Sequence, residues 1–285
     1  MAFGRIVVVG ARGMLGQAVM ADLTGKGYNV VGLGSDQCNL LHDAEAIHRI
    51  LALLEPTLIL QTAAYTDVDG AERNPELAMA INKDGTQKLA EVAAQLDAIF
   101  AYVSTDYVFD GHTDRPYLPE DKANPINTYG RSKLYGEVWA KESSDTHYVL
   151  RTSWLYGRHR KNFVSMILES AREAKPMTIV TDWIGTPSWT GNVAHAIERV
   201  ITSGAYGTYH VADQGAVSKY DQAVAICRAA GLPSDHLKPV SYKELNFSAQ
   251  RPAYSPLNSG ELAMPSWETG LHAYLAELAT VTDRV

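Results

Sequence analysis

A glycine-rich turn between an apolar run and a helical segment constrains this chain more than any other feature of its sequence. The run Ile6–Val9 consists of β-branched residues without alternation, which is typical of a strand buried on both faces. It leads directly into the turn Gly10–Gly16, and a helix is predicted from Met14 to Leu23. A strand that enters a helix through such a turn predicts a nucleotide-binding α/β fold.

The same alternation of strands and helices continues over the first half of the chain. Further strands are predicted at Tyr28–Leu33, Thr57–Leu60, Ile99–Val103 and His147–Leu150. Further helices are predicted at Asp43–Leu54, Glu76–Leu96 and Tyr129–Lys141. Because strands that are joined through helices pair in parallel, we predict an α/β fold with a doubly wound, Rossmann-type parallel sheet.

Beyond Trp154 this rhythm loosens, and prolines and tryptophans appear in short irregular stretches. Such segments commonly form a ligand-binding lobe over the carboxyl edge of the sheet. We therefore predict an NAD(P)-binding domain at residues 1–153, to which a segment near 189–212 returns. Residues 154–285 are predicted to form mainly a smaller, C-terminal substrate-binding lobe.

Composition excludes several classes of protein. With 25 Lys and Arg against 32 Asp and Glu, the net charge is −7, so nucleic acid is not an expected partner. The two cysteines, Cys38 and Cys227, support neither a disulfide framework nor a zinc site, and His112, His159 and His195 lack ligand spacing, so we predict no metal site. No apolar stretch approaches the roughly 20 residues of a membrane span. We expect a cytoplasmic protein without a membrane partner.

The three glycines of the turn have separate predicted roles. Gly10 permits the tight bend, Gly13 lets the backbone approach a pyrophosphate, and Gly16 lets the helix pack closely on the strand. The helix N-terminus then offers free N–H groups and partial positive charge to the phosphates. A turn that uses glycine only for packing is the alternative, and the flanking strand and helix favour a dinucleotide site.

The preferred dinucleotide depends on the end of the second strand. An acidic residue there would hold the ribose 2′-hydroxyl of NAD(H), but this place reads Leu33-Gly34-Ser35, and Asp36 comes slightly later. Arg12 in the turn is either a solvated side chain or a partner for a 2′-phosphate, which the guanidinium fork suits. We expect NADP(H) as the preferred cofactor, with NAD(H) as the alternative.

A candidate catalytic set follows the fourth predicted strand. Tyr129 and Lys133 are four residues apart, so both side chains lie on one helix face. An adjacent ammonium lowers the pKa of a phenol from about 10 toward neutrality, which suits the proton transfer of a carbonyl reduction. The Thr105 hydroxyl, at the sheet's carboxyl edge, can hydrogen-bond the substrate oxygen or, alternatively, form a turn.

Together these motifs resemble the extended short-chain dehydrogenase/reductases and, within them, the dTDP-4-dehydrorhamnose reductase family. The resemblance covers nearly the whole chain, and its most specific carriers are the strings Ser104–Gly111 (STDYVFDG) and Arg151–Gly157 (RTSWLYG). It implies an NAD(P)H-dependent reduction of the 4-keto group of dTDP-4-dehydro-L-rhamnose to dTDP-L-rhamnose, with Tyr129 as the proton donor.

The resemblance also implies binding roles for individual residues. Those at the cofactor are Gly13, Met14 and Leu15 by the phosphates, Asn39 and Leu40 by the adenine, Ala63, Ala64 and Tyr65 along the sheet edge, Lys133 at the nicotinamide ribose, and the proton donor Tyr129. Those at the substrate are Thr105 and Asp106 at the sugar and Trp154 as the pocket wall. Because the chain is net acidic, we also expect Arg251 to contact the nucleotide diphosphate.

Two positions depart from the family pattern. Trp183 follows Asp182 where the family usually carries Gln, which leaves the base or sugar specificity open. Ala18 stands where metal-bridged dimeric members carry Glu, so magnesium-mediated dimerisation is not implied and the chain is expected to be a monomer or homodimer.

Two other functions compete with the reductase. One is a non-catalytic, cofactor-binding regulatory subunit similar to the β-subunit of methionine adenosyltransferase. The intact catalytic set is an argument against this function. The other is a nucleotide-sugar epimerase or dehydratase. A dehydratase needs an acid/base pair beside the threonine, and here Asp106 is followed by Tyr107 rather than by Glu.

Overall fold

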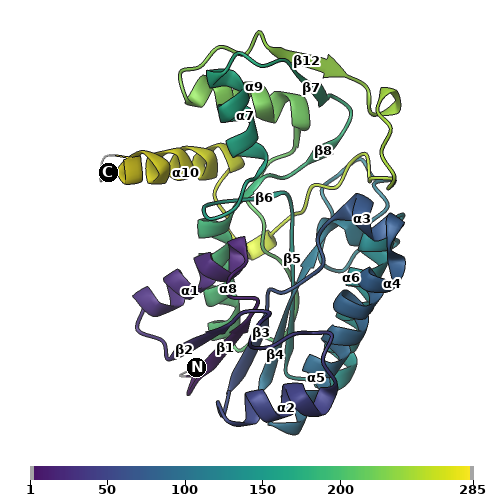
Figure 1. Cartoon of the computed structure of the whole chain (residues 1–285), viewed down its shortest axis with the longest axis vertical. Coiled ribbons are helices and arrows are strands. Elements are labelled where there is room, and N and C mark those ends of the chain that lie inside the picture. The colour runs from purple at the N-terminus through teal and green to yellow at the C-terminus, as the bar shows by residue number, and fades with distance from the viewer. Residues whose placement is uncertain (1–2, 283–285) are drawn as a thin grey trace.

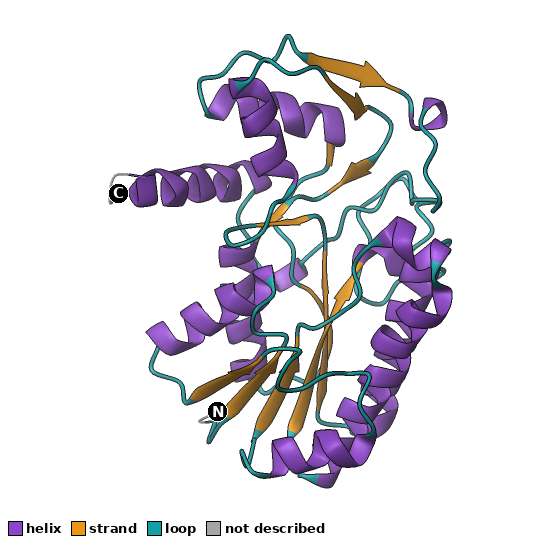
Figure 2. Cartoon of the chain, viewed as in Figure 1, coloured by secondary structure: helices purple, strands orange, loops and turns teal. Residues whose placement is uncertain are grey.

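A parallel sheet of six strands forms the centre of the larger part of the molecule (Figures 1 and 2). The computed structural model describes residues 3–282, so the outermost residues of the two predicted domains lie outside it. The strands, in the spatial order β10-β5-β4-β3-β1-β2, are Gly207–His210, His147–Thr152, Ile99–Thr105, Leu58–Gln61, Ile6–Val9 and Val30–Leu33. All neighbouring pairs are parallel, which confirms the predicted doubly wound α/β fold.

Helices cover both faces of this sheet, as Figure 1 shows. One face carries α1 (Met14–Gly25) and α8 (Thr190–Ser203), and the other carries α2 (Ala44–Ala52), α5 (Gly85–Gln95) and α6 (Thr128–Ser143). Successive residues of β1 point to opposite faces: Ile6 and Val8 enter the core under α1 and α8, whereas Val7 and Val9 enter the other core. A strand that must fill two cores has no polar position, which explains its unbroken apolar run.

The predicted helix Glu76–Leu96 is interrupted in the structure. Its residues form α4 (Pro75–Met79), a π-helical turn η1 (Ala80–Asp84) and then α5. The π-helical turn contains Asn82, whose side-chain amide accepts a hydrogen bond from Tyr65 N at 2.8 Å and donates one to Tyr65 O at 2.9 Å. A further helix, α3 (Val68–Arg73), was not predicted. Through these hydrogen bonds the π-helical turn holds the segment after β3 in place. This segment borders the site described below.

The remaining elements form a smaller lobe beyond the carboxyl ends of the strands (Figure 1). Its helices are α7 (Phe163–Arg172), α9 (Lys219–Ala229) and α10 (Trp267–Thr282). Its strands pair as β6 (Leu155–Tyr156) with β9 (Ser188–Trp189), β7 (Met177–Val180) with β12 (Leu237–Val240), and β8 (Ile184–Gly185) with β11 (Val217–Ser218). The single-turn helices are η2 (Asp106–Val108), η3 (Tyr242–Glu244) and η4 (Gly260–Leu262). Between residues 3 and 282, no helix has the length and apolar character to cross a membrane.

Candidate active site

A cavity of about 750 Å³ runs along the carboxyl ends of β1, β3, β4 and β5. It collects most of the residues that the sequence analysis singled out, namely Gly10, Arg12, Gly13, Met14, Leu15, Gly16, Asn39, Leu40, Ala63, Ala64, Thr105, Asp106, Tyr129, Lys133 and Trp154. Because the carboxyl edge of a parallel sheet is where ligands bind in such folds, we take this cavity as the candidate active site.

The glycine turn has a shape that admits a phosphate. Gly10 has a φ of 94°, in the left-handed region, and a Cβ there would collide with the backbone of Ala63. A Cβ on Gly16 would collide with the Gly10 carbonyl oxygen, so helix and strand approach closely. The N-cap of α1, Gly13, provides no side-chain hydrogen bond, which leaves the first N–H groups of this helix free of a side-chain cap. Free N–H groups at a helix N-terminus fit a dinucleotide pyrophosphate.

Arg12 extends over the end of β2. Its guanidinium forms an ion pair with Asp36 at 2.9 Å, and both side chains are more than half exposed. Ser35 and Gly34 line the cavity beside it. The arginine and the acidic residue that were weighed for the choice between NADP and NAD therefore contact each other beside the cavity.

Thr105, Tyr129 and Lys133 come together at the other end of the cavity. The capping of α6 fixes the first turn of their helix, because the Asn127 side chain accepts a hydrogen bond from Gly130 N at 2.7 Å. Lys133 Nζ donates to the Val103 carbonyl oxygen at 2.7 Å. Tyr129 and Thr105 are joined by a side-chain hydrogen bond.

The electrostatics of this set differ from the expectation. We predicted that Lys133 lowers the pKa of Tyr129, and this is wrong for the structure described here: burial raises the pKa of Tyr129 to about 12, and only the hydrogen bond with Thr105 opposes it. Burial also lowers the pKa of Lys133 to about 7, although the Glu137 carboxylate acts in the opposite direction. Desolvation exceeds the effect of the neighbouring charge, because Lys133 is buried and Tyr129 is half-buried in the cavity wall.

Asp106 is buried next to Thr105. Burial raises the pKa of Asp106 to about 6, although Ser255 Oγ and Thr105 Oγ1 donate hydrogen bonds to its carboxylate at 2.6 and 3.1 Å. Thr105 also accepts a hydrogen bond from Tyr107 N at 3.3 Å, so the turn-forming role weighed for this hydroxyl is present as well. One hydroxyl therefore both shapes η2 and faces the cavity.

Two predicted binding residues do not line the cavity. Tyr65 is held by its backbone to Asn82, as described above. Arg251 forms an ion pair with Asp69 through two nitrogens, and its guanidinium lies over the ring of Phe247 at 4.3 Å. The structure therefore does not bring Arg251 to a free position where a diphosphate would bind, because its donors are directed to a carboxylate of α3.

Several lining residues were missed by the sequence analysis. Arg160 and Lys161 border the cavity from the loop between β6 and α7, and Cys38 and Ile81 border it as well. Loops and single buried side chains give no periodic signal in the sequence. The family-specific string Arg151–Gly157 ends three residues before Arg160. It is the sequence feature closest to Arg160 and Lys161 that could have pointed to them.

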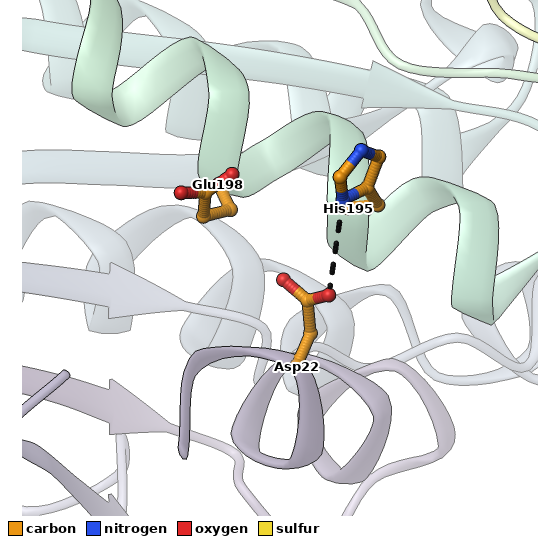
Figure 3. A group of neighbouring side chains, drawn as sticks. All are labelled: Asp22, His195 and Glu198. Atoms are coloured by element: carbon orange, nitrogen blue, oxygen red, sulfur yellow. Dashed lines mark ion pairs between the residues drawn. The ribbon is translucent and has the colours of Figure 1, made fainter. Parts of the chain in front are cut away.

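Potential metal ligands also gather outside the cavity, where the sequence spacing gave no sign of them. Asp22 of α1 lies opposite His195 and Glu198 of α8 (Figure 3). Lys26 Nζ occupies the space between them, at 2.9 Å from Asp22 Oδ2, 3.0 Å from Glu198 Oε2 and 2.9 Å from His195 Nδ1. The lysine ammonium already supplies the positive charge for these carboxylates, so we interpret the cluster as a salt-bridge contact between α1 and α8.

Comparison with known families decides where this fold and cavity belong. The model of the RmlD substrate binding domain family matches residues 4–280. The chain belongs to this family. Relatives named dTDP-4-dehydrorhamnose reductase identify it as the family of these reductases, which confirms the resemblance drawn from the sequence and the prediction of an NAD(P)-dependent oxidoreductase.

Relatives in this family align over almost the full chain. The dTDP-4-dehydrorhamnose reductase of Mycolicibacterium smegmatis is 35% identical, with 98% of this chain and 88% of that protein covered. The crystal structure of the dTDP-4-dehydrorhamnose reductase from Bacillus anthracis in complex with NADP has a TM-score of 0.92 at 33% identity, covering 96% of this chain and 99% of that one. A dTDP-4-dehydrorhamnose reductase structure from Clostridium acetobutylicum has a TM-score of 0.93 at 32% identity, covering 97% of this chain and 100% of that one.

Proposed function

We propose that this chain reduces the 4-keto group of dTDP-4-dehydro-L-rhamnose to give dTDP-L-rhamnose, with NADPH as the preferred reductant and NADH as the alternative. The observation that carries the proposal is one cavity that holds a phosphate-binding glycine turn at one end and Thr105, Tyr129 and Lys133 at the other. The relatives named dTDP-4-dehydrorhamnose reductase support this choice of sugar nucleotide.

The cofactor, when bound, supplies the hydride. The N-terminus of α1 and the backbone at Gly13 would hold its pyrophosphate, because free N–H groups and the helix dipole favour negative charge there. Arg12 would hold a 2′-phosphate by exchanging its exposed partner Asp36 for the more highly charged group. Lys133 would bind the nicotinamide ribose.

The proton for the reduced oxygen would come from the Tyr129 hydroxyl. With a pKa of about 12, this phenol is fully protonated at neutral pH, as a proton donor must be. The hydrogen bond with Thr105, which lowers the pKa of Tyr129, would stabilise the phenolate that the transfer leaves. Thr105 would hydrogen-bond the same substrate oxygen, and Asp106 and Trp154 would border the sugar.

An assay of cofactor oxidation tests this proposal. Purified protein is mixed with NADPH or NADH and with a dTDP-, UDP- or GDP-linked 4-keto sugar, and the loss of absorbance at the reduced nicotinamide band is followed. We expect oxidation with dTDP-4-dehydro-L-rhamnose and a rate at least tenfold lower with the UDP and GDP compounds. Absence of turnover on every keto sugar, with a synthetase retained in a stable complex, would favour the regulatory subunit. Turnover without net cofactor consumption would favour an epimerase.

A further inference from the structure

Lys219 is a partly buried cation next to the candidate site, and none of the steps above uses it. It is the first residue of α9, and its backbone N–H donates to the Trp183 carbonyl oxygen at 3.1 Å. Its Nζ lies 3.5 Å from the centre of the Trp154 ring and 4.4 Å from the centre of the Phe163 ring. The ammonium is therefore enclosed between two aromatic faces.

Few polar groups compete for this ammonium. Lys219 Nζ donates one hydrogen bond, to Gln222 Oε1 at 3.3 Å, and within residues 3–282 no carboxylate comes within ion-pair distance of it. Asp106 of η2 is the charged group that acts on it through space. An ammonium removed from water and lacking an ion partner interacts most strongly with the electron-rich faces of aromatic rings.

Trp154 is held in an unusual conformation at this contact. Its φ is 44°, in the left-handed region that non-glycine residues seldom adopt. Its ring lies against Gly185, where a Cβ would collide with it, and meets the Trp183 ring edge-on with centroids 5.8 Å apart. The indole lines the cavity, while the Lys219 side chain does not.

We propose that Lys219 is a positioning residue that holds the Trp154 ring as the wall of the sugar-binding end of the cavity, through contact of its ammonium with the indole face. The identity of the sugar rests on the proposed function. The contact joins α9, which belongs to the smaller lobe, to the segment after β5. The smaller lobe therefore also orients the Trp154 ring at the cavity. Removing the ammonium should weaken binding of the sugar nucleotide and leave cofactor binding and the chemical step intact.

The first experiment measures steady-state kinetics of Lys219→Met. We expect KM for the 4-keto sugar nucleotide to rise about tenfold, the scale of a desolvated cation–π contact, with kcat and the KM for NADPH within about twofold of wild type. Lys219→Arg, which keeps the charge, should restore most of the affinity. Lys238→Met removes an exposed lysine from the same lobe and should leave KM unchanged. In a Trp154→Leu background the effect of Lys219→Met should fall below about threefold.

The second experiment needs no substrate, so it tests the pair even if the proposed function fails. Burial lowers the pKa of Lys219 to about 7, and a charge this close to an indole alters its fluorescence. We expect tryptophan emission of the wild type to change with a midpoint near pH 7, and this transition to be lost in Trp154→Leu and in Lys219→Met. A transition of unchanged amplitude in Lys219→Met would come instead from a buried carboxyl, such as Asp106 with a pKa of about 6 or Asp213, beside Trp189, with a pKa of about 7. That result, or an unchanged KM in Lys219→Met, would overturn the proposal.

Discussion

The Glu137 carboxylate lies one helical turn beyond Lys133 and is completely buried with Arg151. Arg151 Nε and Nη2 donate to it at 2.8 and 2.7 Å, and Ser104 Oγ donates at 2.6 Å. This network places a negative charge beside the lysine of the candidate site and anchors the residue that precedes Thr105. The carboxylate is the group that raises the pKa of Lys133 against the effect of burial.

Activity is expected to fall as the pH rises. We predict that in Glu137→Gln this fall occurs at a lower pH than in the wild type. Lys133 functions as an ammonium, which is lost as the pH rises through its pKa, and the neutral amide no longer raises that pKa. The measurement is kcat/KM against pH, which reports ionisations of the free enzyme. Glu137→Asp keeps the charge and should keep the midpoint. Ser104→Ala removes only a hydrogen bond to the carboxylate, so an equal shift in this variant would contradict the prediction.

We predict that Tyr129→Phe lowers kcat by about 100- to 10,000-fold, since that is the usual contribution of a general acid. The dissociation constant of NADPH, measured by its fluorescence, should change less than threefold. Tyr107→Phe is a matched control, because the two rings meet edge-on with centroids 5.7 Å apart and both line the cavity. Near wild-type turnover in Tyr129→Phe would reject Tyr129 as the proton donor.

We predict that Arg12→Ala raises the KM for NADPH about tenfold or more and leaves the KM for NADH unchanged, because a charge-assisted bond to the 2′-phosphate is lost. Asp36→Asn is the counterpart: it releases Arg12 from its ion pair and should not raise the KM for NADPH. Equal changes for both cofactors in Arg12→Ala would show that the arginine does not distinguish them.

We predict that Arg251→Met lowers the free energy of unfolding by about 2 kcal/mol at pH 7, because the half-buried Asp69 loses its charged hydrogen-bond partner. The hydrogen bond from Arg251 lowers the pKa of Asp69, so the pair stabilises the fold above the unfolded pKa of about 3.9 and loses this effect as the pH falls through the lower, folded value. The difference from wild type should therefore shrink below pH 4 in urea denaturation.

The counter-result for Arg251 is specific. An unchanged free energy of unfolding in Arg251→Met, together with a higher KM for the nucleotide sugar, would contradict this prediction. It would support the contact with the nucleotide diphosphate that we expected from the sequence. Asp69→Asn supplies the matched comparison, since it removes the same ion pair from the other side.

The local sequence predicted β1 to β5 and most of the helices between them, though not α3 or the π-helical turn η1, and it pointed to many residues that line the cavity. The β-branched run Ile6–Val9 specified a strand buried on both faces, the glycines of Gly10–Gly16 specified a turn that no larger residue can form, and a four-residue spacing put Tyr129 and Lys133 on one helix face. These properties depend on periodicity and backbone sterics, which neighbouring residues set.

The tertiary structure alone decided partners and charge states. Arg251 and Asp69 are 182 positions apart, the Lys219 ammonium contacts the Trp154 ring from helix α9, and Lys26 contacts side chains from both α1 and α8. The pKa of Tyr129 was misjudged because spacing reveals a neighbouring charge but not how completely both groups are removed from water. Desolvation and long-range pairing arise from whatever the folded chain places over a side chain, and no local pattern carries that information.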